Sequence, residues 1–276
     1  VKKGIGRMVK ILMPMLGLLL IFMVTYGIIN GAFKEALAFL FKPDFTKITS
    51  DTFLVAMGQA FFSLSLGMGS IMAYGAYMSK DQNIASTSVS VGALDTLVAI
   101  MAGLAVFPII FAIQGLEASS GPGLVFISLQ TAFNTMDFGN IIGPIFFILL
   151  SVAALSSSIS ILEPGVAYLA EEGYLSRTKS AIIISITCWL IGIGTAFGFD
   201  QDGNNFFQAN VELISVNIMQ PLGGMLIAIF IGWFMKESLI KNELGNINQA
   251  IYQIWRVFIK FVAPIGVGIV LISQLF

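Results

Sequence analysis

The stretch GQAFFSLSLGMGS, residues 58–70, lies in an apolar segment long enough to cross a membrane, yet it is poorly suited to a continuous helix. Glycine costs about 1 kcal/mol relative to alanine inside a helix, and Gly67 and Gly69 are two residues apart. The hydroxyls of Ser63 and Ser65 can bond the local backbone and compete with helical hydrogen bonds. The segment indicates a broken helix whose freed backbone groups line a cavity and bind a substrate or an ion. Close packing of small residues against a neighbouring helix is the alternative.

The composition of the chain predicts that this segment lies in a lipid bilayer. Charged residues make up 11% of the 276 residues, whereas a soluble globular domain carries roughly 25%. Hydrophobic residues make up 57%, and the mean hydropathy is +0.92. So few polar side chains cannot cover a folded surface that faces water, but a surface that faces lipid should be apolar.

Seven apolar segments reach the length of about 20 residues that a helix needs to span the bilayer. They predict an all-α membrane protein with about seven transmembrane helices, folded as a single membrane domain over residues 1–276. The N-terminal run from Ile11 to Ile29 exceeds the apolar core of a signal peptide, about 7–15 residues, and is therefore assigned to the first span. The predicted spans are 8–30, 52–79, 88–114, 139–170, 178–198, 208–235 and 252–275.

Lysines and arginines are distributed unevenly between the two sides of these spans. With residue 1 in the cytoplasm, the outer side carries only Lys34, Lys42 and Lys47. Cytoplasmic loops are enriched in these residues, so the bias predicts that Phe276 lies outside. We expect a multi-pass protein of the plasma membrane, of the bacterial inner-membrane type. The basic residues assigned to the cytoplasmic side are Lys2, Lys3, Arg7, Lys10, Lys80, Arg177, Lys179, Lys236, Lys241, Arg256 and Lys260.

Several functional classes are excluded by what the chain lacks. The net charge of -1 gives no reason to expect a nucleic acid as partner. The chain has no histidine, the commonest metal ligand and general base, and its single cysteine, Cys188, lies in an apolar run. These absences argue against a metalloenzyme and against a serine or cysteine hydrolase, so the sequence does not predict an enzyme.

A second polar stretch, LSSSISILEP at residues 155–164, interrupts the fourth predicted span. Its three consecutive serines place hydroxyls around most of one helical turn. Hydroxyl and carbonyl oxygens suit a hard cation such as sodium. The alternative is that each hydroxyl bonds to the carbonyl one turn earlier, which needs no ion.

Acidic residues also occur inside the predicted spans. Asp95 lies about one third of the way into its span, where a charge costs several kcal/mol unless a partner offsets it. It therefore indicates a cation site, although a protonated structural acid is the alternative. Glu163 precedes Pro164 near the middle of the fourth span, and Glu212 lies near the outer end of the sixth, where snorkelling to the interface explains it equally well.

Three strings of residues closely resemble the neurotransmitter:sodium symporter family, the sodium-dependent transporters that include the bacterial leucine transporter. They are GQAFFSLSLGMGSIMAYGAYMSKDQNI (58–84), ALDTLVAIMAGLAVFP (93–108) and LSSSISILEPGVAYLAEE (155–172). The resemblance implies an incomplete LeuT-type inverted-repeat transporter fold, in which the seven spans are helices five to eleven. The resemblance implies that helices one to four are absent, and because the chain also begins without methionine, we expect a fragment.

The resemblance implies two sodium sites, each made of oxygens from separate parts of the chain. At the first site, Ser63 and Asp95 would ligate the ion. At the second, the Ala153 carbonyl and the hydroxyls of Ser156 and Ser157 would hold it.

The resemblance also bears on chloride. Some animal members of the family need this anion near the positions of Gln59 and Ser63, whereas members without the requirement use a carboxylate instead, often one turn beyond Asp95. That later position is Ala99 here. Asp95 would therefore supply the negative charge, and we expect chloride independence.

Substrate-binding and gating residues are likewise implied by the resemblance. Phe62 would act as an aromatic lid, and Met68, where an aromatic residue often occurs, is adaptable enough to admit a larger apolar or aromatic substrate. Tyr77 and Glu171 would belong to the inner gate and Glu212 to the outer one. The implied substrate-binding residues are Phe62, Ser65, Met68, Ser157 and Ile161.

The function implied is sodium-coupled symport of an amino acid by alternating access. The expected partners are the lipid bilayer and, as a small-molecule substrate, an amino acid of apolar or aromatic type. No residue indicates whether a second copy of the chain binds to form a homodimer, and that question stays open. Two other functions stay open on the sequence alone, namely an ion-channel subunit and a membrane sensor that binds amino acids without moving them.

Overall fold

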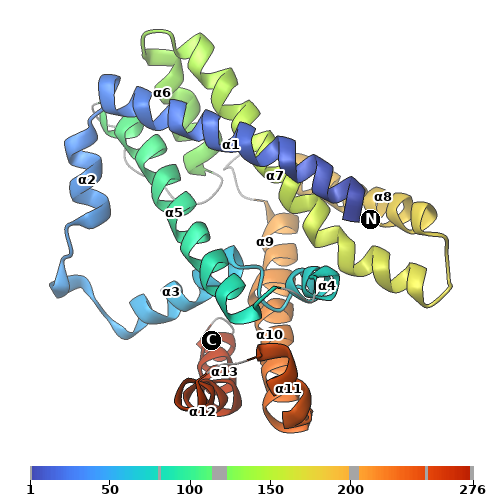
Figure 1. The fold of residues 1–276 in the computed structure, drawn as a ribbon. Helices are drawn as coiled ribbons and strands as arrows, with labels where there is room; N and C mark the ends of the chain where they lie inside the picture. Colours follow the sequence, from blue (N-terminus) through green and yellow to red (C-terminus); the bar gives the residue numbers. More distant parts are fainter. Residues whose placement is uncertain (1, 80–81, 114–122, 199–204, 246–247, 274–276) are drawn as a thin grey trace. The chain divides into compact units, whose positions relative to one another are not determined.

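The structure is a computed structural model that describes residues 2–79, 82–113, 123–198, 205–245 and 248–273. Val1, Lys80 and Phe276, on which the predicted orientation draws, lie outside these ranges. Within the ranges the chain is helical and contains no β-strand, which confirms the predicted all-α class (Figure 1).

Four of the helices, η2 to η5, are of π type, and one, η1, is of 3-10 type. In chain order the elements are α1 (Lys2–Asn30), α2 (Phe33–Phe41), η1 (Phe45–Lys47), α3 (Ser50–Ser63), α4 (Ser70–Tyr77), α5 (Ile84–Phe111), η2 (Leu124–Ser128), α6 (Leu129–Thr135), α7 (Gly139–Glu171), α8 (Arg177–Phe197), α9 (Phe206–Glu212), η3 (Leu213–Met219), α10 (Gln220–Ile229), η4 (Phe230–Phe234), α11 (Glu237–Leu244), α12 (Gln249–Val257), η5 (Phe258–Val262) and α13 (Ala263–Ser273).

Six helical stretches of the described chain are long and apolar enough to cross a membrane. The predicted span 52–79 is not among them, because it consists of two shorter helices, α3 and α4, separated by a break. The six stretches are Val9–Asn30, Ile84–Phe111, Gly139–Glu171, Arg177–Phe197, Phe206–Phe234 and Gln249–Ser273.

Two of the π-helices end two residues before a proline. Pro221 follows η3, and Pro264 follows η5. Proline lacks the backbone N–H and its ring clashes with the carbonyl of the previous turn, so the helix widens there, and the N–H of Gln220 donates to the carbonyl five residues back, that of Ser215. The spans therefore stay helical through each proline by taking up one extra residue in the widened turn.

The described residues form two compact units, of which the first comprises Val1–Lys47 and Val91–Ser158. Helices α1, α5, α6 and the first part of α7 enclose its apolar core (Figure 1). Met23, Ile109 and Leu129 are fully buried in this core.

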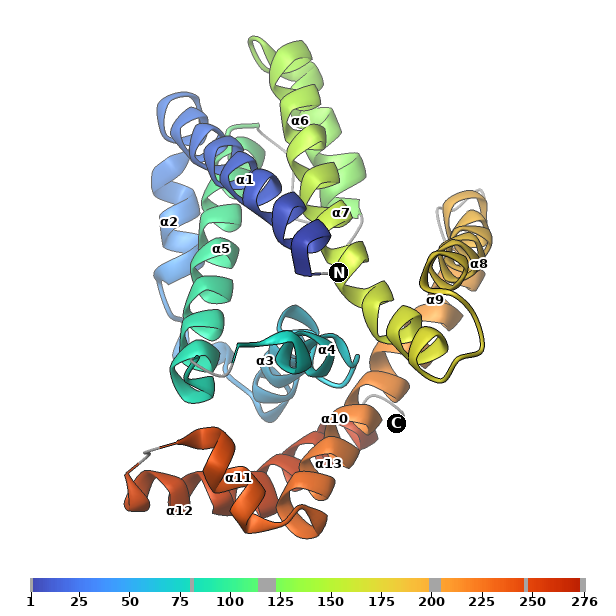
Figure 2. The same cartoon turned by 45° about the vertical axis from the view of Figure 1, so that its right-hand side comes forward.

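The second unit comprises Ile48–Ser90 and Ile159–Phe276. Within it, α10 packs along α13, and α3 contacts both helices (Figure 2). Helix α8 presents Trp189 and Leu190 on its surface, each more than half exposed, which is the character expected of a surface that faces lipid.

Candidate functional site

The break between α3 and α4 is the most unusual backbone in the described structure. Ser65, Gly67 and Gly69 have φ angles of 52°, 82° and 82°. Glycine adopts this left-handed region readily, but a residue with a side chain adopts it only at a cost. A serine held there is characteristic of functional sites, where surrounding structure maintains the strain. The break that the glycines and serines indicated is therefore present.

Backbone hydrogen bonds hold the N-terminal half of the break. The Ser65 N–H donates to the Phe62 carbonyl and the Leu66 N–H to the Phe61 carbonyl, both at 3.0 Å. On the other side, α4 begins at Ser70, and the residue before it, Gly69, supplies no side-chain cap. The first amides of a helix have no partner within the helix and favour an anionic group, so this end of the break has the character of an anion site.

The residues predicted for the first sodium site belong to different units. Ser63 is the last residue of α3, in the second unit, and is exposed. Asp95 lies on α5, in the first unit, and is partly buried. Their joint role as sodium ligands stays a prediction.

The residues predicted for the second sodium site lie on one turn of α7. The Ser156 hydroxyl donates to the Ala153 carbonyl at 2.8 Å, so two of the three predicted oxygens are adjacent. This bond is the ion-free alternative for a serine in a helix, and Ser158 makes a similar bond to Ala154. Ser157 lies beside them and is exposed. Two neighbouring hard oxygens fit a sodium ion, and the site stays a prediction.

The predicted substrate residues are also divided between the units. Phe62 is the penultimate residue of α3 and is 49% exposed, and Met68 lies in the break. Ile161 on α7 is 48% exposed and lies in the second unit, whereas Ser157 lies in the first. Phe62, Ser65 and Met68 lie together at the end of α3 and in the break. The rest of the pocket stays a prediction.

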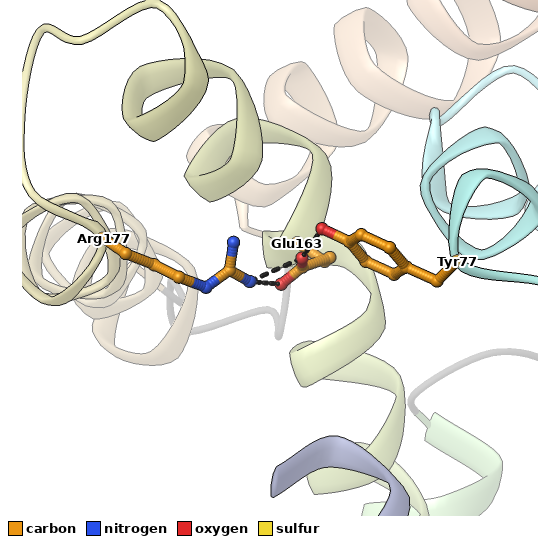
Figure 3. A network of polar contacts seen from close by, with 3 residues as sticks. All are labelled: Tyr77, Glu163 and Arg177. Atoms are coloured by element: carbon orange, nitrogen blue, oxygen red, sulfur yellow. Dashed lines mark hydrogen bonds and ion pairs between the residues drawn. The ribbon is translucent and has the colours of Figure 1, made fainter. Parts of the chain in front are cut away.

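A buried carboxylate links three helices of the second unit. Glu163 on α7 is 5% exposed. The Tyr77 hydroxyl of α4 donates to its Oε1 at 2.6 Å, and Arg177 Nη2 of α8 lies 2.5 Å and 2.6 Å from its two oxygens. Figure 3 shows the tyrosine and the arginine reaching Glu163 from opposite sides.

Helix α4 is attached to α7 by a second contact one turn earlier. The Tyr74 hydroxyl and the Ser160 hydroxyl lie 2.8 Å apart. On a helix, residues three apart share a face, so Tyr74 and Tyr77 of α4 meet Ser160 and Glu163 of α7 in the same order. These two contacts tie α4, the helix that follows the break, to α7.

The predicted gate residues differ in their surroundings. Tyr77 is bonded, but its carboxylate partner is Glu163. Glu171 is exposed near the end of α7, and no described residue forms an ion pair with it. Glu212 ends α9 and is exposed. The gating roles of Glu171 and Glu212 stay predictions.

Two residues of the second unit make contacts near the break or Glu163 but were not among the predicted site residues. Arg177 served only to orient the chain, yet it neutralises Glu163. The buried acid beside Pro164 was the available signal, because a charge inside the membrane needs a partner. Gln220 is 3% exposed and donates from Nε2 to the Phe61 carbonyl at 2.8 Å, across 159 residues of sequence. No sequence pattern could have indicated that contact.

Comparisons with known proteins agree on the family. A family model described as the Sodium:neurotransmitter symporter family matches residues 1–276. An uncharacterized sodium-dependent transporter of Haemophilus influenzae is 36% identical over 99% of the chain and 61% of its own length. The uncharacterized sodium-dependent transporter YhdH of Bacillus subtilis is 32% identical over 99% of the chain and 62% of its own length.

Among solved structures, the chain resembles the crystal structure of MhsT in complex with L-phenylalanine. The two share 44% sequence identity and superpose with a TM-score of 0.84, over 99% of this chain and 63% of MhsT. The chain thus spans about three-fifths of the length of these relatives. The match confirms the resemblance and the LeuT-type fold. The chain belongs to the sodium:neurotransmitter symporter family.

Proposed function

We propose that the whole protein containing this chain is a sodium-coupled symporter of an apolar or aromatic amino acid. The observation that carries the proposal is the break between α3 and α4, with Ser65, Gly67 and Gly69 in left-handed conformations. Such discontinuous membrane helices expose backbone groups that bind substrates and ions. The likeness to MhsT, whose structure contains L-phenylalanine, supports an amino acid as the substrate.

In this proposal sodium is a second substrate with two binding sites. Ser63 and Asp95 ligate the first ion, and Ala153, Ser156 and Ser157 ligate the second. The substrate carboxylate binds at the break, near the amides of α4, and helps to hold the first ion. Because each ligand then stabilises the same conformation, sodium moving down its gradient drives the substrate with it.

The contacts between α4 and α7 give the inner gate a physical basis. Movement of α4 away from α7 would break the Tyr77–Glu163 and Tyr74–Ser160 hydrogen bonds. We assign this end of α4 to the cytoplasmic side, as the distribution of lysines and arginines predicts.

Uptake of labelled L-phenylalanine into liposomes containing the whole protein tests the function. An inward sodium gradient should drive accumulation, and a potassium gradient of equal size should not. Accumulation that is indifferent to this replacement would contradict the proposal.

The same vesicles separate the two rival functions. A channel subunit would pass sodium without an amino acid and without saturation. A sensor would bind the amino acid in a sodium-dependent way but would show no exchange of labelled for unlabelled substrate. A symporter shows both saturable uptake and exchange.

Chloride independence is a separate prediction, because it rests on Asp95. Replacing all chloride by gluconate should leave sodium-driven uptake unchanged within about twofold. Asp95→Asn removes the fixed charge beside the first ion, and loss of one nearby charge should raise the sodium concentration for half-maximal uptake about tenfold or more. A chloride requirement in the unsubstituted protein would show that Asp95 does not serve this purpose.

A further inference from the structure

One face of α10 lies directly against the break. Gln220, Gly223 and Gly224 are spaced i, i+3 and i+4, so they share a side of the helix. A Cβ on Gly223 would lie 2.5 Å from the Gly67 carbonyl oxygen, and a Cβ on Gly224 would lie 2.6 Å from the ring of Phe61. Only residues without side chains let the α10 backbone come this close.

Gln220 adds a specific hydrogen bond to this contact. Its Nε2 donates to the Phe61 carbonyl at 2.8 Å, and the same carbonyl accepts the Leu66 N–H at 3.0 Å. A carbonyl oxygen has two lone pairs, so the two donors saturate it. Phe61 immediately precedes Phe62 and Ser63, the proposed lid and sodium ligand.

Packing alone does not explain a glutamine at this position. The Oε1 atom of Gln220 is buried and has no hydrogen-bond partner among the described residues. An apolar cavity of about 310 Å³ borders the contact, lined in part by Phe61, Leu66 and Gly224. Burying an unpaired polar atom is unfavourable, so an apolar side chain of equal size would pack at least as well.

We propose that Gln220 is a positioning residue for the break. Its amide fixes the Phe61 carbonyl, keeps that oxygen from competing for the ion, and sets the direction in which Phe62 and Ser63 leave α3. This role rests on the proposed function, because Phe62 and Ser63 act as ligands only in a symporter.

Gln220→Met in the whole protein tests the role. Methionine is close to glutamine in size and flexibility, but it lacks both the donor and the unpaired oxygen. A role in packing alone predicts equal or greater thermal stability and unchanged transport. Positioning predicts instead a sodium concentration for half-maximal uptake raised roughly five- to tenfold, the value for one lost buried hydrogen bond, with the maximal rate within about twofold of the unsubstituted protein.

The matched control is Gln253→Met, at an exposed glutamine of α12, which should change neither quantity. Hydrogen exchange of the amides of residues 64–69 provides a second measurement that does not depend on transport. In Gln220→Met these amides should exchange faster, because the Phe61 carbonyl that accepts the Leu66 N–H is no longer held in place by the Gln220 amide.

An unchanged half-saturating sodium concentration in Gln220→Met would overturn the proposal. If the unsubstituted protein shows no sodium-driven uptake, the proposed function fails on its own. In that case faster exchange at residues 64–69 still supports positioning of the break by Gln220, and unchanged exchange overturns it.

Discussion

Gly67→Ala is expected to reduce sodium-driven uptake at least about 30-fold. The new Cβ would lie 2.1 Å from the Gln220 carbonyl oxygen and 2.7 Å from the Gly224 nitrogen, and Gly67 has a φ of 82°. Both neighbours are backbone atoms, so no side chain can rotate to make room. The left-handed conformation costs roughly 1–2 kcal/mol, and overpacking adds about 1–3 kcal/mol, which together lower the population of the native break by a factor of about 30 or more.

Gly75→Ala is the control for this change. It also adds one methyl group to a glycine of the same span, but among the described residues no atom outside the neighbouring backbone of its own helix lies within 4 Å of a Cβ there. Gly75 lies inside α4, so alanine should favour the helix by up to about 1 kcal/mol and leave uptake intact. Uptake by Gly67→Ala equal to that of Gly75→Ala would mean that α10 does not confine the break.

Arg177→Met is expected to have the largest effect on stability. It leaves the buried Glu163 without its cation, and removing one partner of a buried ion pair costs about 3–5 kcal/mol. The Arg177 side chain is 36% exposed, so water can replace part of the interaction, and we expect about 3 kcal/mol. The measurement is the midpoint of thermal unfolding of the whole protein in detergent.

A double substitution distinguishes the lost charge from lost packing. Glu163→Gln removes the negative charge, but its amide oxygen still accepts a hydrogen bond from the Tyr77 hydroxyl. Adding Glu163→Gln to Arg177→Met should therefore reverse most of the fall in the midpoint of thermal unfolding. Lys179→Met, at an exposed lysine two residues along α8, should leave it unchanged. A double variant as unstable as Arg177→Met alone would show that the charge of Glu163 is not the cause.

The sequence predicted the helices better than it predicted their contacts. Apolar runs indicate spans because the bilayer requires about 20 residues of helix, and Gly67 and Gly69 indicated the break because glycine is unfavourable inside a helix. The widened turns at η3 and η5 were not predicted, although Pro221 and Pro264 follow them closely. A proline in a membrane helix is compatible with a kink or a widened turn, and neighbouring helices decide between them.

In the candidate site, too, the sequence predicted the local residues but not their contacts with other helices. Phe62, Ser63, Ser65 and Met68 are adjacent in sequence, so finding them at the break required only local reasoning. The partners of Glu163 come from α4 and α8, and which tyrosine and arginine reach it depends on how three helices pack. The resemblance supplied Tyr77 and Glu171 as gate residues without pairing them, and only the structure supplies Glu163 as the partner of Tyr77.

The widened turn η3 has a consequence for how this span tolerates insertions and deletions. Successive residues of an α-helix are about 100° apart around its axis, so one residue more or fewer ordinarily rotates everything that follows, whereas the widened turn η3 takes up one extra residue. Deleting one residue within Leu213–Met219 would let this turn close to an ordinary α-turn, and the glycine pair of α10 would keep its direction toward α3. A change in chain length that would rotate the rest of an ordinary helix would thus be absorbed before it reaches the break.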